Sequence, residues 1–154
     1  MISPPTYRHT QSGAKPAIVV AVVMAIVAVL VVPAVMRAQP QPPLYVWLVI
    51  AGSFGIALIS TLTFSRMTID VSDRRLSWWF GSGFPRFSLP LSEITSTRIV
   101  RNPWYYGLGI HITPQGWLYN VAGRSAVEIT KSNGGRIRLG TNEPDVLLAA
   151  ITKR

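Results

Sequence analysis

The chain has 154 residues, of which 49% are hydrophobic and only 14% are charged, and its formal net charge is +9. Charged residues usually make up about 25% of a soluble domain, so the composition is unusually apolar. The sequence contains no cysteine, which excludes disulfide bonds, thiolate nucleophiles and cysteine metal ligands. The apolar excess is concentrated in two segments of the N-terminal half.

The N-terminal third of the chain divides into a polar segment and two apolar runs. Residues 1–16 are polar and contain prolines, so we predict a flexible N-terminal tail. Residues 17–36 and 44–64 carry no charge, and each has the length, about 20 residues, that spans a bilayer as a helix. Buried core helices are one alternative, and a secretory signal peptide is another for the first run. The preferred interpretation is a transmembrane hairpin over residues 17–64.

The connection between the two apolar runs, residues 37–43, is short and contains three prolines. We therefore predict that the two helices are antiparallel neighbours. Small residues recur every four positions in both runs: Ala17, Ala21 and Ala25 in the first, Ala51 and Gly55 in the second. Such spacing either allows close helix packing in lipid or reflects only the abundance of alanine in apolar helices.

Basic residues flank the predicted hairpin unequally. Arg8 and Lys15 precede it, Arg37 alone lies in the connection, and Arg66, Arg74 and Arg75 follow it. The positive-inside rule then predicts that both ends of the chain are cytoplasmic and that the connection is outside. The expected location is a membrane that the chain crosses as a multi-pass protein.

From Thr68 onward the hydrophobic period changes to two, which indicates β-strands. About eight short candidate strands follow, separated by turn residues, as is typical of an antiparallel sandwich or barrel. The segment 142–151 ends this pattern, because Pro144 and Asp145 suit the first turn of a helix. We therefore predict an α+β domain over residues 66–154, built as an antiparallel β-barrel with a C-terminal capping helix.

One hairpin of this domain can be registered from its side-chain pattern. A three-residue loop, 132–134, sets Ile129 opposite Ile137 on the core face and Glu128 opposite Arg138 on the outer face. A two-residue turn would set Ile129 opposite Arg138, so the hydrophobic pattern rejects it. We expect Arg138 to point to solvent or to a partner.

The segment 101–120 is rich in aromatic residues and glycine. Alternation predicts that Tyr106, Leu108, Ile110 and Ile112 face the core. Gly107, Gly109 and His111 then lie on the opposite face, as a glycine strip that a ring or backbone can approach closely. We expect His111 to fill or flank this strip. The turn at 113–116 is open between a bulge at Gly116 and a plain two-residue turn.

Several short motifs occur together in the second half of the chain. They are "PLSEI", "YGLGI", "YNVAG", "IRLGT" and "EPDVLLAAI". With the predicted hairpin, they resemble the uncharacterised bacterial membrane proteins that carry a transmembrane helical hairpin and a pleckstrin-homology (PH)-like domain. The resemblance covers residues 17–152 and implies a small barrel of two orthogonal sheets closed by a helix. It also implies a location in a bacterial cytoplasmic (inner) membrane. His111 stands where those proteins usually carry arginine, and most of them lack an assigned biochemical function.

The sequence offers no catalytic constellation. It lacks a nucleophile elbow, a phosphate-binding glycine loop and paired carboxylates at a recognisable spacing. We therefore predict no catalytic residue, no cofactor and no metal ligand, and we expect the protein not to be an enzyme. An enzyme of unknown class that uses His111 is the third alternative.

Positive charge is the remaining functional feature. Residues 66–154 contain twelve arginines and lysines against six acidic residues, and no nucleic-acid motif accompanies them. The candidate contact residues are Arg74, Arg75, Arg136 and Arg138. The leading hypothesis is a membrane-anchored module that binds a protein partner or self-associates at the cytoplasmic face. Binding of anionic lipid headgroups is the alternative.

The predicted topology can be tested by cysteine labelling, because the natural chain has no cysteine. In intact cells, Gln41→Cys should react with a membrane-impermeant maleimide, whereas Ser125→Cys should react only after permeabilisation. The reverse labelling pattern would contradict the cytoplasmic assignment of the β domain.

Overall fold

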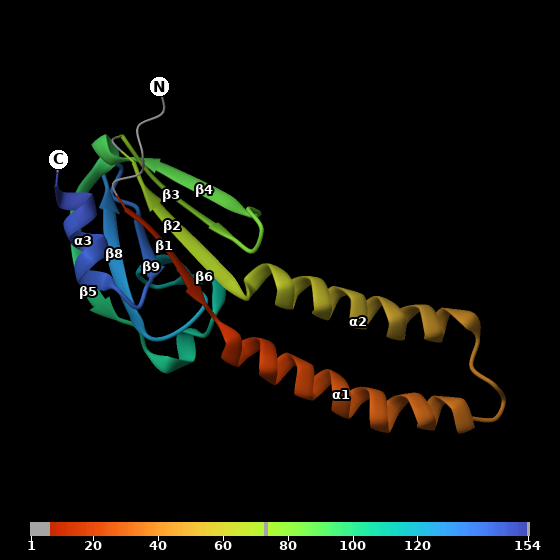
Figure 1. The fold of residues 1–154 in the computed structure, drawn as a ribbon. Helices are drawn as coiled ribbons and strands as arrows, with labels where there is room; N and C mark the ends of the chain where they lie inside the picture. The colour runs from red at the N-terminus through yellow and green to blue at the C-terminus, as the bar shows by residue number, and fades with distance from the viewer. Residues whose placement is uncertain (1–6, 73, 154) are drawn as a thin grey trace.

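The computed structural model describes residues 7–72 and 74–153, with the backbone alone at 14–16. Two long helices project from one side of a β-rich domain (Figure 1). The strands are β1 (Tyr7–Ser12), β2 (Arg66–Val71), β3 (Arg75–Phe80), β4 (Arg86–Pro90), β5 (Ile94–Arg101), β6 (Gly109–Thr113), β7 (Gly116–Asn120), β8 (Ser125–Lys131) and β9 (Arg136–Gly140). The helices are α1 (Ala14–Arg37), α2 (Leu44–Phe64) and α3 (Pro144–Thr152), with single 3-10 turns η1 (Leu91–Glu93) and η2 (Trp104–Tyr106).

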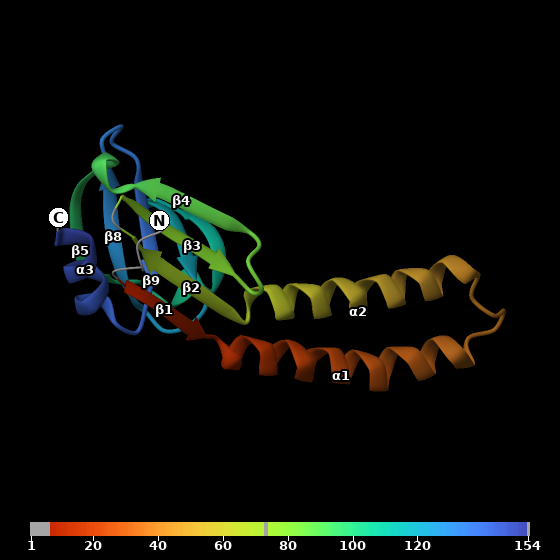
Figure 2. The same ribbon diagram turned by 45° about the horizontal axis from the view of Figure 1, so that its top comes forward.

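The two apolar runs form α1 and α2, as predicted. Both helices are long and apolar enough to cross a membrane, and the most apolar part of each is not buried against the rest of the chain. They leave the β domain side by side and run in opposite directions (Figures 1 and 2). A side chain at Gly52 or Gly55 would meet no atom within 4 Å. The two helices therefore do not pack closely at Gly55.

The prediction of a flexible tail is wrong for residues 7–12. This segment is strand β1, which pairs antiparallel with β2 from Tyr7↔Val71 to Ser12↔Arg66. Its alternate residues are the less exposed ones, and Gln11 is buried, with its Nε2 donating to the carbonyl of Ala122 at 2.6 Å. Because the residues of this segment are mostly polar, the sequence did not indicate a strand with one inward face. Residues 1–6 of the predicted tail lie outside the described residues.

The two long helices are inserted between two paired strands. β1 runs directly into α1, and α2 runs directly into β2. The N–H of Gly13 donates to the carbonyl of Ser65 at 2.6 Å, which joins the two helix bases. A Cβ on Gly13 would lie 2.2 Å from the carbonyl oxygen of Val121, so only glycine fits this junction. The helical hairpin thus takes the place of a turn between β1 and β2.

The strands form two sheets, and the sheets do not close into the barrel that we expected. One sheet has the order β1-β2-β3-β4, and the other has the order β5-β8-β9-β7-β6. β4 follows Pro85 and ends at Pro90, and proline cannot donate to a further ladder. The second sheet is mixed rather than antiparallel, because β7 and β9 run parallel. The α+β layout with a C-terminal helix agrees with the prediction.

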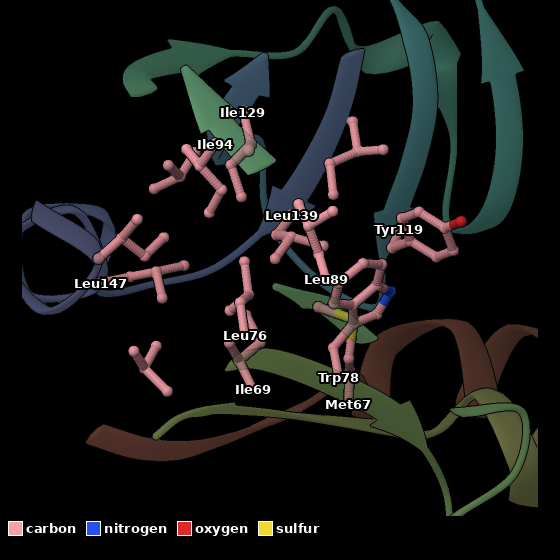
Figure 3. Packing of buried hydrophobic residues seen from close by; sticks show 14 of the residues in the cluster. Met67, Ile69, Leu76, Trp78, Leu89, Ile94, Tyr119, Ile129, Leu139 and Leu147 are labelled. Atoms are coloured by element: carbon pink, nitrogen blue, oxygen red, sulfur yellow. The ribbon is translucent and has the colours of Figure 1, made fainter. Parts of the chain in front are cut away.

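The hydrophobic core fills the space between the two sheets (Figure 3). Met67, Trp78 and Leu89 come from one sheet, and Ile129 and Leu139 come from the other. The apolar face of α3 completes the core, since Leu147 and Ile151 are buried in the same cluster.

The β6–β7 turn is the plain two-residue turn, one of the two alternatives that the sequence left open. Thr113 pairs with Gly116, which is the register of a two-residue turn. Gly116 has a φ of 111°, a conformation that side chains disfavour. A Cβ there would lie 2.1 Å from the carbonyl oxygen of Arg136 on β9. Glycine is therefore required by both conformation and space.

We expect Gly116→Ala to destabilise the protein more than Gly134→Ala. Gly134 also has a positive φ, 79°, but a Cβ there would meet no atom within 4 Å. Conformational strain alone costs about 1–2 kcal/mol, and the clash at Gly116 should add about 1–3 kcal/mol. Denaturant unfolding of the full chain in detergent, followed by tryptophan fluorescence, measures both. Equal losses would mean that β7 and β9 are not held this closely.

Candidate functional site

A cleft of about 480 Å³ lies where the two long helices meet the β domain. Its walls include Ala17 and Val20 from the base of α1, Ala57 and Phe64 from α2, and the segment Leu108–His111 at the start of β6. β6 is the edge strand of its sheet and lies on the side of the domain nearest the helices (Figure 1). We call this space the junction cleft.

The junction cleft is continuous with a groove of about 350 Å³ between α1 and α2. Ala17, Val20, Ala57 and Thr61 line both spaces. Further along the helices, the groove is lined by residues that include Ala21, Met24, Gly55 and Leu58. We call this space the interhelical groove. Three of the five small residues at four-residue spacing, Ala17, Ala21 and Gly55, therefore border this groove.

The glycine strip is covered by the ring of His111. Gly107 and Gly109 both have positive φ, 71° and 107°. A Cβ on either residue would contact His111 Nε2, at 3.7 and 3.5 Å. The same nitrogen lies within hydrogen-bonding distance of the Leu108 carbonyl oxygen. His111 thus flanks the strip and shapes one wall of the junction cleft.

The expected core face of this segment is only partly formed. Ile110 packs against the core, but Ile112 is 74% exposed. Tyr106 belongs to η2 and Leu108 precedes β6, so neither follows the predicted alternation. Ile112 is exposed because β6 is an edge strand. Trp104 is also exposed, so an apolar surface extends from the loop before the junction cleft along β6.

Three of the four predicted contact arginines lie at the end of the β domain away from the helices. β2 begins next to α2, so the turn that contains Arg74 and Arg75 is at its far end. The β8–β9 hairpin, which leads into Arg136, lies at the same end, because η1 is hydrogen-bonded both to the turn that contains Arg74 and to this hairpin. The first residue of η1 donates to the Arg74 carbonyl, and the last accepts from the N–H of Ser132. This position does not favour contact with a bilayer spanned by α1 and α2.

The expectation that Arg138 points to solvent is wrong. The predicted register is confirmed, with Glu128 opposite Arg138, but these residues are only 2% and 7% exposed. Arg138 Nε donates to Glu128 at 2.7 Å, and its Nη1 donates to Asn102 Oδ1 at 3.1 Å. Arg98 Nε donates to the other Glu128 oxygen at 2.8 Å. Arg138 is therefore part of a buried polar network, which is not available to a partner.

The charge on Glu128 is stabilised by its two arginines. Burial alone would raise the pKa of this carboxyl group. The hydrogen bonds and positive charges of Arg138 and Arg98 outweigh burial, so the pKa of Glu128 is lowered. The network therefore carries its full stabilisation at neutral pH.

The junction cleft has a mainly apolar lining. Among the described residues that line it, His111 alone has a titratable ring, and that ring contacts a backbone carbonyl rather than an acid or base. The part of the chain that the structure describes holds no group of three or more histidine, aspartate or glutamate side chains suited to a metal ion. The apolar lining suits an apolar or amphipathic ligand.

No protein-family model matches this sequence, and no curated protein matches it. The resemblance to bacterial membrane proteins with a PH-like domain therefore stays a prediction.

Sequence reasoning missed the junction cleft, because its walls come from three distant parts of the chain. Only the spacing of small residues in the two apolar runs pointed towards one of its walls. The strand β1, which joins the helix bases, carried no recognisable hydrophobic alternation.

The buried network predicts unequal effects at its two arginines. Arg138→Gln removes the buried partner of Glu128 and should lower the free energy of unfolding by about 3–5 kcal/mol. Arg98→Gln should cost less than about 1 kcal/mol, because the Arg98 side chain is 65% exposed. Chemical denaturation at neutral pH measures both.

The same network predicts a pH dependence. Because the pKa of Glu128 is lowered in the folded state, its stabilisation should be lost as the pH falls below the ordinary value of 4.5. Glu128→Gln should lose stability at neutral pH and show a flatter decline in acid. For the preceding prediction, equal losses of unfolding free energy in Arg138→Gln and Arg98→Gln would contradict the buried network.

Proposed function

We propose that the protein is a non-enzymatic, membrane-anchored binding module. Its site is the interhelical groove together with the junction cleft, and its ligand is a helix of a membrane protein, either a partner or a second copy. The β domain lies at the cytoplasmic face of a bacterial inner membrane, and it has a PH-like ancestry.

The observation that carries this proposal is the open interhelical groove. Helices in lipid associate mainly through close packing, and small residues permit it. Here Ala17, Ala21 and Gly55 border a space of about 350 Å³, and a Cβ on Gly55 would meet no atom within 4 Å. A third helix could bring its own side chains against this surface.

The junction cleft extends the surface of the interhelical groove from the apolar helices to the β domain. Leu108 and Ile110 of the β domain line it together with Phe64 of α2. A partner helix in the groove would therefore contact the β domain where it leaves the lipid. The exposed Ile112 and Trp104 lie beyond the cleft and enlarge the apolar surface. This continuity favours a protein helix over a lipid chain as the principal ligand.

The proposal is tested by photo-crosslinking in native membranes. A photoreactive amino acid at Leu58, which lines the groove, should form a covalent adduct with a protein. The matched control is Ile56, which is also exposed on α2 but does not line the groove. This control should yield lipid adducts only. Ala57→Leu, which fills both the groove and the cleft, should abolish the protein adduct at Leu58.

The mass of the adduct distinguishes the outcomes. A mass twice that of the chain identifies self-association, and another discrete mass that disappears with Ala57→Leu identifies a partner. Lipid adducts alone at Leu58, or equal protein adducts at both positions, would contradict helix binding in the groove.

A further inference from the structure

A second cavity, of about 290 Å³, lies where α2 ends and β2 begins. Leu62 and Arg66 line it from the α2–β2 connection, and Gly81, Ser82 and Phe84 line it from the β3–β4 turn. We call it the α2-exit cavity. It is separate from the junction cleft, with which it shares only Ser65 among its lining residues.

The backbone holds the two walls of this cavity together. The N–H of Gly81 donates to the Arg66 carbonyl at 3.0 Å. Gly81 has a φ of 51°, and a Cβ there would lie 3.0 Å from the Thr63 carbonyl oxygen. The turn that carries Ser82 and Phe84 is thus fixed against the end of α2.

The lining of the cavity is amphipathic. Phe84 is 80% exposed and, with Leu62, supplies an apolar wall. Arg66 and the hydroxyl group of Ser82 supply a polar wall. Arg66 is exposed and forms no ion pair with any residue that the structure describes. A ligand with one anionic group and one apolar group would satisfy both walls.

The charge around the cavity is positive. Arg86 lies on the same outer face of the sheet as Arg66, with its guanidinium 4.5 Å from the centre of the Trp79 ring. The nearest acidic residue on that face, Asp70, is paired with Arg8 at 2.6 Å. The C-terminal carbonyls of α2 carry a partial negative charge that opposes an anion. Binding of an anion here therefore depends on the guanidinium of Arg66.

The position of the cavity identifies the source of the anion. The apolar helix α2 ends at Phe64, so its C-terminal end lies at the boundary between lipid chains and water when it spans a bilayer. Phospholipid phosphates occupy this level. We infer that the α2-exit cavity binds an anionic phospholipid of the adjacent leaflet. Arg66 contacts the phosphate, and Phe84 lies against the first carbons of the acyl chain. This site goes beyond the proposed helix-binding function.

The test uses the full-length protein in phosphatidylcholine nanodiscs that contain a small fraction of photoreactive phosphatidylglycerol. After irradiation, mass spectrometry of the peptides should find the lipid on residues 62–66 and 81–84. Arg66→Gln should reduce this labelling about fivefold, because it removes one basic residue beside the headgroup. The matched control, Arg75→Gln, removes an exposed arginine from the far end of the same sheet and should leave labelling unchanged.

Four results would overturn the inference. Labelling of Arg66→Gln at the wild-type level would mean that Arg66 does not contact the lipid phosphate. Equal labelling by photoreactive phosphatidylcholine would mean that no anionic lipid is selected. Suppression of labelling by excess inorganic phosphate, but not by the same ionic strength of chloride, would make free phosphate the ligand.

Phe84→Ala removes an exposed ring without disturbing the core, so it keeps the test decisive if Arg66→Gln fails to fold. Wild-type labelling in this variant would also overturn the inference.

Discussion

The pairing of β1 with β2 is the constraint on which the rest of the molecule depends. Because Ser12 lies opposite Arg66 and Gly13 bonds to Ser65, the two helices must leave the sheet as immediate neighbours. Both helix bases therefore lie on one side of any membrane that the hairpin spans. The junction cleft exists because this pairing sets a helical hairpin directly against a sheet edge.

On the other sheet, the buried ion pair of Arg138 and Glu128 also fixes the position of a chain segment. Arg138 holds Asn102, the first residue after β5, through a hydrogen bond on the outer face. Arg124 binds the carbonyl of the same asparagine at 3.1 Å. The chain then continues through η2 to β6, which borders the junction cleft. This buried polar network thus fixes the start of the segment that leads to the wall of the proposed binding site.

The sequence predicted the elements whose periodicity is strong and local. The two uncharged runs and the β8–β9 register followed from the hydrophobic pattern, because burial on one face fixes the register. β1 could not be predicted, because its inward residues include Gln11 and His9 rather than aliphatic ones. The burial of Arg138 depends on Asn102, which is 36 residues distant in the chain. Neither cavity was predictable from local periodicity. The junction cleft joins α1, α2 and β6, and the α2-exit cavity depends on the β2–β3 pairing that sets the β3–β4 turn against the end of α2.

The insertion of the helices between paired strands also orders the events of synthesis. β1 leaves the ribosome before either helix and cannot meet β2 until residues 13–65 have been made. If only one arm crossed, about 30 Å of hydrocarbon would separate Ser12 from Arg66. The four-stranded sheet would then lack its edge strand, and Met67 and Ile69 would lose neighbours in the core. If the hairpin enters a bilayer, completion of the β domain therefore requires that its two arms cross together.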